Sequence, residues 1–359
     1  MNKTYLRKAA LGAVALLAAP LLASCGSDDG GGGEGGGDEA GKIAFLMPDR
    51  ASTRYEQQDR PLFEAKVKDL CPECEVVYQN ADADPGKQQQ QANSAIAQGV
   101  KVLVLDAVDT KAAASIVENA QSQDIPVVTY DRPITTTPAD YYISFDNEGI
   151  GKMIAESLVE GLKAEKAEGG IFLVYGSPTD DAAQLIKKGM KAGVADSGYD
   201  VLAEYDTPEW SPQKAQDWVS GQITKFEGDV VGTVAANDGT AGGTIAAFKA
   251  AGTEPMPLVT GNDAEVAAIQ RIVAGDQFNT ISKPIKIVAE ASAEVAVAFL
   301  RGEKPEGKTT LFDTPSQLFT PKVVTVDNLQ EVIIDGGIYE ASEICTSKYK
   351  AACEKAGIG

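Results

Sequence analysis

The chain has no histidine, and this absence removes several classes of active site. Its 359 residues include 52 acidic and 32 basic side chains but no imidazole. Histidine is the usual base of nucleophilic triads and a common zinc ligand. The sequence therefore excludes His-based triads, His acid–base catalysis and His metal sites. We expect no metal and no cofactor.

Basic side chains are scarce, and the formal net charge is −20. So acidic a chain repels nucleic acid and anionic membrane surfaces, because both are negatively charged. We expect no nucleic-acid partner, and a neutral ligand fits the charge better. The length and a hydrophobic content of 43% allow two domain cores.

The apolar run at residues 9–23 is short for a membrane-spanning helix and follows the basic residues Lys3, Arg7 and Lys8. This is the pattern of a secretion signal, which we assign to residues 1–24. The sequence Leu-Ala-Ser-Cys ending at Cys25 resembles the lipobox of bacterial lipoproteins, in which the cysteine is lipidated. A plain cleaved signal and an uncleaved anchor are the alternatives.

Residues 25–41 are rich in glycine and acidic residues and nearly lack apolar side chains, so we expect a flexible tether. The protein would then lie outside the cytoplasm, attached by lipid to the outer face of the cell membrane.

Only five cysteines are present, and four remain if Cys25 carries lipid. They form two close pairs, Cys71 with Cys74 and Cys345 with Cys353. Three pairings are possible, and an oxidising compartment favours the two local disulfides. The Cys-x-x-Cys of the first pair also fits a redox motif or half of a zinc site. No second such motif and no histidine completes a zinc site.

Short apolar runs alternate with helical patterns along the rest of the chain, which is typical of parallel, doubly wound α/β sheets. We expect strands at 42–47, 75–79, 100–106, 126–130, 141–144, 170–175, 199–205, 230–236, 258–261, 277–281, 322–326 and 331–334. We expect helices at 60–70, 85–99, 110–123, 150–162, 181–197, 212–226, 240–251, 264–274 and 284–302, and a polar loop at 48–58. The pattern restarts after Asn147, which predicts two similar lobes with a cleft between them.

Polar side chains follow several of these strands, at the edge where ligands bind in open α/β sheets. Each pair alone fits a helix N-cap, because Asp and Asn are preferred there. Their recurrence at successive strand ends favours a binding site. The candidates are Asp131, Arg132, Asp146, Asn147, Asn237, Asp238, Asp263 and Lys283.

Aromatic candidates flank this set. Trp210 lies in a loop between two prolines, so its indole could stack on a sugar ring, and packing on the surface is the alternative. Arg54 and Tyr55 would supply the opposite face and a donor. The glycine-rich segment after Asn237 lacks the endings of nucleotide-binding loops. The acidic loop at 80–86 lacks the glycine and glutamate positions of a calcium loop.

Several motifs resemble the periplasmic sugar-binding proteins of bacterial ABC transporters, of the ribose, galactose and xylose type, and most closely the xylose branch. The resemblance covers about residues 42–342. The matching segments are Tyr-Asp-Arg at 130–132, Tyr-Ile-Ser-Phe-Asp-Asn-Glu at 142–148, Gly-Ser-Pro at 176–178, Asn-Asp at 237–238, Gly-x-Asp-Ala at 261–264 and Lys-Pro-Ile at 283–285. Asp180, Asp181 and Ala182 stand where the family has an additional Asn.

The resemblance implies a type I periplasmic-binding-protein fold, with two doubly wound lobes joined by three crossovers near Asn147, Lys283 and Thr320. The lobes would comprise residues 42–147 with 284–320, and 148–283 with 321–359. It implies a monomeric receptor, not an enzyme. The receptor would bind a monosaccharide, D-xylose, and deliver it by hinge closure to a permease with a cytoplasmic ATPase. Another pentose or hexose, an autoinducer or a nucleoside is the alternative ligand, and a carboxylate-based glycosidase is the rival class.

Overall fold

The computed structural model describes residues 41–226 and 228–359, which belong to one compact unit. The expected signal segment, the tether up to residue 40 and the Cys25 lipidation site lie outside the described residues. Within the described part, no helix combines the length and the apolarity needed to cross a membrane.

The first sheet has seven strands in the order β11-β12-β5-β4-β3-β1-β2. All neighbours are parallel except β11 and β12. The strands are β1 (Lys42–Met47), β2 (Glu75–Asn80), β3 (Val102–Leu105), β4 (Val127–Tyr130), β5 (Tyr141–Phe145), β11 (Thr309–Leu311) and β12 (Thr314–Phe319).

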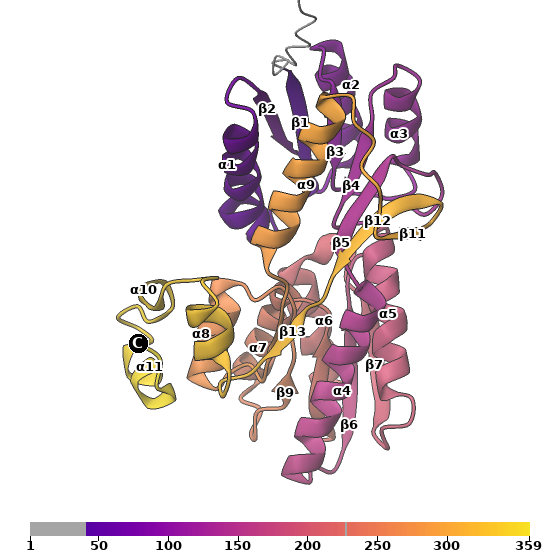
Figure 1. Cartoon of the computed structure of the whole chain (residues 1–359). Coiled ribbons are helices and arrows are strands. Elements are labelled where there is room, and N and C mark those ends of the chain that lie inside the picture. Colours follow the sequence, from indigo (N-terminus) through magenta and orange to yellow (C-terminus); the bar gives the residue numbers. More distant parts are fainter. Residues whose placement is uncertain (1–40, 227) are drawn as a thin grey trace, which may run out of the picture. The chain divides into compact units, whose positions relative to one another are not determined.

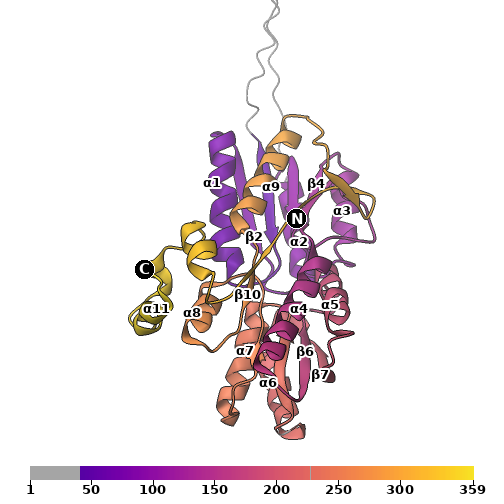
Figure 2. The same ribbon diagram turned by 60° about the horizontal axis from the view of Figure 1, so that its bottom comes forward.

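Helices cover both faces of this sheet. Successive residues of a strand point to opposite faces, so they pack against different helices. In β1, Phe45 packs in the cluster that includes α1 (Arg60–Leu70) and α9 (Ile285–Leu300). Its neighbour Leu46 packs in the cluster of α2 (Pro85–Ala97) and α3 (Ala114–Gln121). Figures 1 and 2 both show α1 and α9 side by side on one face. This sheet and its helices are called the first lobe.

The second sheet has the order β7-β6-β8-β9 and is parallel throughout. Its strands are β6 (Gly170–Tyr175), β7 (Asp200–Asp206), β8 (Val230–Ala235) and β9 (Leu258–Val259). Leu173 of β6 packs in the cluster of α4 (Asn147–Glu165) and α5 (Asp181–Val194). Phe172 faces α6 (Pro212–Lys225) and α7 (Asp238–Ala251).

A two-stranded antiparallel pair, β10 (Thr280–Ser282) with β13 (Lys322–Val324), accompanies the second sheet, together with α8 (Val266–Ala274). The second lobe comprises this sheet, these elements and the C-terminal segment. The chain passes between the lobes three times, from β5 to α4, from β10 to α9 and from β12 to β13 (Figure 1). The expected fold class of two parallel-sheet lobes is confirmed.

Several segments differ from the sequence-based expectation. The expected strand at 331–334 is a π-helix, η3 (Gln330–Asp335), whose Ile333 is buried in the cluster that includes α8. Packing there outweighs the β-preference of its branched side chains. Part of the expected loop at 48–58 is a second π-helix, η1 (Tyr55–Asp59), which runs directly into α1. Strands β11 and β12 were not expected at all.

The C-terminal segment adds two short helices, α10 (Ala341–Ile344) and α11 (Lys350–Ala356), beside α8. Cys345 is bonded to Cys353 with their Cα atoms 5.8 Å apart. Cys71 is bonded to Cys74 with their Cα atoms 5.3 Å apart. These are the two local pairings favoured by the sequence.

Candidate ligand-binding site

A small polar pocket lies between the two lobes, where strand ends of both sheets meet. Its lining comprises Ser52, Arg54, Tyr55, Asp131, Arg132, Asn147, Asp180, Ala182, Ile186, Trp210, Asn237, Asn262, Asp263 and Lys283. The free space inside is about 20 Å³, enough for about one or two water molecules. The side chains of the two lobes therefore contact one another directly.

Arg54 joins both lobes at one wall of the pocket. Its guanidinium donates two hydrogen bonds to Asp59, from Nε at 3.0 Å and from Nη2 at 2.7 Å. Its Nη1 lies 3.3 Å from Asp131 of the first lobe and 3.6 Å from Asp263 of the second. Burial favours a lower pKa for Arg54, but the carboxylates of Asp131 and Asp59 outweigh burial and raise the pKa well above its usual value.

Asp131 and Lys283 continue this network. Lys283 Nζ lies 2.8 Å from Asp263 Oδ1 and 3.6 Å from Asp131 Oδ1. Burial acts to raise the pKa of Asp131, but the cations Arg54, Lys283 and Arg132 outweigh it and lower the pKa to about 2. Asp131 is therefore ionised at neutral pH, which makes it a hydrogen-bond acceptor.

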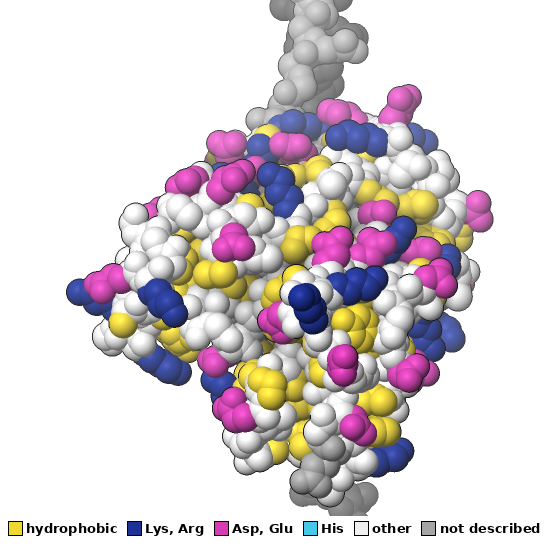
Figure 3. Space-filling model, turned by 90° about the horizontal axis from the view of Figure 1, so that it is seen from below, with side chains coloured by type: hydrophobic (Ala, Val, Ile, Leu, Met, Phe, Trp, Pro, Cys, Tyr) yellow, Lys and Arg dark blue, Asp and Glu magenta, His cyan; other side chains and the backbone are white. Residues whose placement is uncertain are grey.

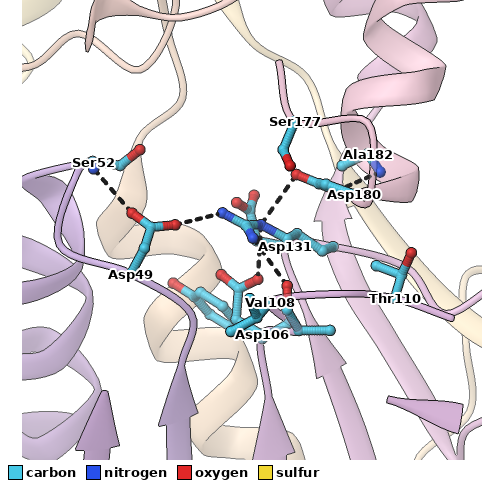
Figure 4. Close-up of polar contacts among 12 residues, drawn as sticks. Asp49, Ser52, Asp106, Val108, Thr110, Asp131, Ser177, Asp180 and Ala182 are labelled. Carbon is cyan, nitrogen blue, oxygen red and sulfur yellow. Dashed lines mark hydrogen bonds and ion pairs between the residues drawn. The ribbon is translucent and has the colours of Figure 1, made fainter. Parts of the chain in front are cut away.

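Arg132 is surrounded by carboxylates. Its Nη2 donates to Asp49 Oδ2 at 2.9 Å, and its Nε lies 3.3 Å from Asp106 Oδ1 and 3.1 Å from Asp180 Oδ2. Figure 4 shows the carboxylates of Asp49, Asp106 and Asp180 turned toward this centre. Burial acts to lower the pKa of Arg132, and Tyr55 and the carboxylates outweigh it and raise the pKa well above its usual value. Arg132 is a fixed cation in the pocket wall.

Trp210 forms an apolar face of the pocket. It ends η2 (Pro208–Trp210) and is 6% exposed. Its backbone has φ +55°, a left-handed conformation that is unusual for a non-glycine residue. Its Nε1 donates to Asp180 Oδ2 at 2.9 Å, which fixes the plane of the indole.

Three amides complete the lining. Asn147 donates to the Tyr142 hydroxyl at 3.4 Å. Asn237 Oδ1 caps α7 by accepting from Thr240 N at 2.9 Å. Asn262 donates to Asp263 at 3.3 Å, and its own Oδ1 is buried without a hydrogen-bond partner. An unpaired buried oxygen has a free-energy cost that a ligand hydroxyl would relieve.

Comparison with known proteins identifies the family of this chain. Residues 43–304 match the family model described as "Periplasmic binding protein domain". The chain belongs to the periplasmic binding protein family. The resemblance drawn from the sequence motifs is therefore confirmed. The family consists of non-catalytic, extracytoplasmic binding proteins, in agreement with the expectation of a receptor rather than an enzyme.

Three similar proteins show the extent of the match. The D-xylose-binding periplasmic protein of Escherichia coli (strain K12) is 34% identical over 311 residues, covering 84% of this chain and 92% of that protein. A multiple sugar-binding periplasmic receptor of Rhizobium radiobacter is 29% identical, covering 85% and 93%. The structure of an ABC transporter solute-binding protein from Clostridium phytofermentans with bound β-D-glucose has a TM-score of 0.76 at 27% identity, covering 84% and 99%.

In this periplasmic binding protein, nine of the eleven residues expected from the sequence line the pocket. Asp146 and Asp238 do not. Asp146 is exposed, and its carboxylate caps α4 by accepting from Gly149 N at 3.0 Å. Asp238 is buried inside the second lobe, where it accepts from Gln277 and Thr280, each at 2.9 Å. The carboxylate of Asp146 caps a helix and that of Asp238 bonds inside the second lobe. The expectation that these two residues line the pocket is therefore corrected.

Several charged residues around the pocket were missed by sequence reasoning. Asp49 and Asp106 follow β1 and β3, so the strand-end rule applied to the other candidates could have found them. Asp59 lies in helical sequence, where no local pattern marks a buried acid. Asp180 precedes α5 and resembles an ordinary cap, which it also is, since it accepts from Ala182 N at 2.8 Å.

The pocket carboxylates are held by cations. In the part of the chain that the structure describes, no group of three or more His, Cys, Asp or Glu side chains is arranged to hold a metal ion. In the acidic loop at 80–86, Asp82 pairs with Arg50 and Lys87. This agrees with a solvated, ion-paired loop.

Proposed function

We propose that this protein binds a monosaccharide, D-xylose, in the pocket between its lobes and presents it to an ABC permease. The pocket carries the proposal, because it brings charged, amide and indole groups of both lobes to one small space. The 34% identity to a D-xylose-binding protein over 84% of the chain supports xylose as the sugar. A neutral sugar also agrees with the acidic composition.

Each group in the pocket has a part in sugar binding. Carboxylates accept from sugar hydroxyls, guanidinium and ammonium groups donate, and amides do both. The C–H face of a pyranose fits the indole of Trp210. The proposed contacts are Arg54, Tyr55, Asp131, Arg132, Asn147, Trp210, Asn237, Asp263 and Lys283, with Asn262 added from the structure.

Entry of a sugar requires the lobes to part, because buried side chains of both lobes enclose the pocket. Its walls are joined by Arg54 with Asp263 and by Arg132 with Asp180. The Thr53 backbone N–H donates to Glu265 across the lobes at 2.8 Å. A sugar that contacts both lobes favours closure by its differential affinity for the closed form. We propose that the moving bodies are the lobes expected from the sequence.

A glycosidase is disfavoured by the bonding of the pocket acids. Such an enzyme needs one carboxylic acid that keeps its proton until catalysis. Asp131, with a pKa of about 2, is ionised, and Asp263 is paired with Lys283 at 2.8 Å. Burial raises the pKa of Asp180, but its oxygens already bond to Ala182 N, Trp210 and Arg132. These acids serve better as acceptors for hydroxyl groups.

The cellular setting is part of the proposal. Cys25 would carry the lipid, and residues 25–41 would tether a monomer near a permease driven by a cytoplasmic ATPase. On the face shown in Figure 3, Lys and Arg side chains stand among Asp and Glu rather than in a continuous basic patch. This supports a partner other than nucleic acid.

A ligand panel tests the proposal. Purified protein without its signal segment is tested by thermal shift with D-xylose, other pentoses, hexoses and a nucleoside. Calorimetry then gives the affinities of the hits. We expect micromolar or tighter binding of D-xylose, equivalent to about −8 kcal/mol. Tighter binding of another sugar or of the nucleoside would replace xylose, and no response to any of them would contradict the proposal.

A further inference from the structure

Asp180 connects three parts of the pocket through one buried side chain. It is 1% exposed. Its Oδ1 accepts from the backbone N–H of Ala182 at 2.8 Å, which caps α5. Its Oδ2 receives the indole N–H of Trp210 at 2.9 Å and lies 3.1 Å from Nε of Arg132. One carboxylate oxygen therefore contacts both the aromatic face of the pocket and its central cation.

The contact with Arg132 crosses between the lobes. The other hydrogen-bond and ion-pair partners of the Arg132 side chain among the described residues belong to the first lobe. They are the Ala107 carbonyl at 2.9 Å, Asp49 at 2.9 Å, the Tyr55 hydroxyl at 3.2 Å and Asp106 at 3.3 Å. Only Asp180 comes from the second lobe.

Asp106 gives Arg132 an alternative partner. It is 0% exposed, and neither of its oxygens has a hydrogen-bond partner, although Nε of Arg132 lies 3.3 Å away. That Nε thus lies between a carboxylate of its own lobe and one of the opposite lobe. When the lobes part, Arg132 keeps Asp106 and loses Asp180. The contact between Arg132 and Asp180 is therefore made only in the closed form.

We infer that Asp180 is a positioning residue, which holds the Trp210 indole against the pocket and bonds to Arg132 when the lobes close. This inference rests on the proposed sugar binding and adds a way in which affinity depends on closure. Asp180 itself lines the pocket, and these two contacts add to whatever contact it makes with the sugar. Loss of the carboxylate weakens sugar binding through a more open unliganded protein and a less fixed indole.

The test compares Asp180→Asn with Asp181→Asn. The Asp180 variant keeps the side-chain size but loses the charge and one acceptor. We expect at least a tenfold loss of sugar affinity by calorimetry. Two fluorophores, one on each lobe, should report a larger separation in the unliganded variant. Asp181 also reaches the first lobe, through Thr135 N at 3.2 Å, but it lies at the surface. Its variant should lose less than about fivefold, as exposed pairs do.

Trp210→Phe tests whether Asp180 acts through the indole. It removes the indole N–H while retaining an aromatic ring. If Asp180 acts through the indole, the two substitutions together should cost less affinity than the sum of their separate losses. Additive losses, or an unchanged lobe separation in Asp180→Asn, would overturn the inference. The separation is measured without sugar, so it tests the inference even if the wild-type protein binds none of the sugars.

Discussion

Nη1 of Arg54 lies 3.6 Å from Oδ1 of Asp263, so a cation of the first lobe faces a carboxylate of the second across the pocket. Lys283 Nζ lies 2.8 Å from the same oxygen. Asp263 thus forms ion pairs with two cations, and it is 6% exposed. Its backbone φ of +101°, in the loop after β9, is uncommon for a non-glycine residue.

Asp263→Asn should weaken sugar binding at least tenfold. The substitution removes the charge that orients Arg54 and Lys283 and turns one acceptor into a donor. A hydrogen bond to a charged group contributes about 1.5–3 kcal/mol, and about 1.4 kcal/mol is tenfold in affinity. Calorimetry with the sugar chosen by the ligand panel measures the loss.

Asp146→Asn is the matched control for Asp263→Asn. Asp146 is exposed and lies outside the pocket lining. Asn is as good an N-cap as Asp, so α4 should be unaffected. We expect wild-type affinity in this variant. Equal affinity in both variants would show that Asp263 does not contribute to binding.

The two tryptophans allow a separate test of stacking. Trp210 lines the pocket, whereas Trp218 stacks on Tyr205 in the second lobe, with ring centroids 5.1 Å apart. We expect sugar to change the fluorescence of Trp218→Phe, in which Trp210 is the remaining indole. Trp210→Phe should show no such fluorescence change. Its sugar affinity should fall about two- to tenfold, as expected for a weakened aromatic contact. A response that survives in Trp210→Phe would place the sugar away from Trp210.

The sequence located the buried strands well and the irregular elements poorly. β1 and β6 begin and end where expected, because each is an uninterrupted apolar run. β12 contains Pro315 and polar residues and lacks such a pattern. It is a strand because it pairs with β5. The run Val332-Ile333-Ile334 suggested a strand, yet it is helical, since its packing partners lie far away in the sequence.

For the pocket, the strand-end rule found the residues that project from regular elements. It could not separate Asn147, which lines the pocket, from its neighbour Asp146, which only caps α4. Both residues occur in the same motif. Which of the two side chains lines the pocket depends on the backbone direction at adjacent positions. It also gave no sign of Asp59, whose role depends on Arg54 five residues earlier in a π-helical turn.

Gly176→Ala should impair sugar binding through the indole. A Cβ at Gly176 would lie 2.2 Å from Cη2 of Trp210, and the rigid ring is held by its bond to Asp180. We expect at least a tenfold loss of affinity, and overpacking should lower the free energy of unfolding by about 1–3 kcal/mol. Calorimetry and urea denaturation measure the two effects.

Gly221→Ala is the control for Gly176→Ala. Gly221 lies in α6, and a Cβ there would meet nothing within 4 Å. Alanine is the better helix former, so stability should stay the same or rise by about 0.5–1 kcal/mol. Sugar affinity should not change. Wild-type affinity in Gly176→Ala as well would show that the position of the indole is not critical.

The stability of the unliganded protein should fall as the pH rises from 4.5 to about 7, because of Glu265. Burial, followed by the charge of Asp263, raises the pKa of Glu265 to about 7. A carboxyl with a raised pKa binds its proton more tightly in the folded protein. Its stabilising contribution is therefore complete below the ordinary value of 4.5 and is lost as the pH rises through about 7.

The variant Glu265→Gln cannot ionise but keeps an oxygen for the Thr53 N–H, so its melting temperature should fall less over this range. Asp238, with a pKa raised by burial to about 8, remains in the variant and should leave part of the slope. Thermal denaturation at constant ionic strength measures both slopes, and parallel curves for the two proteins would contradict the assignment to Glu265.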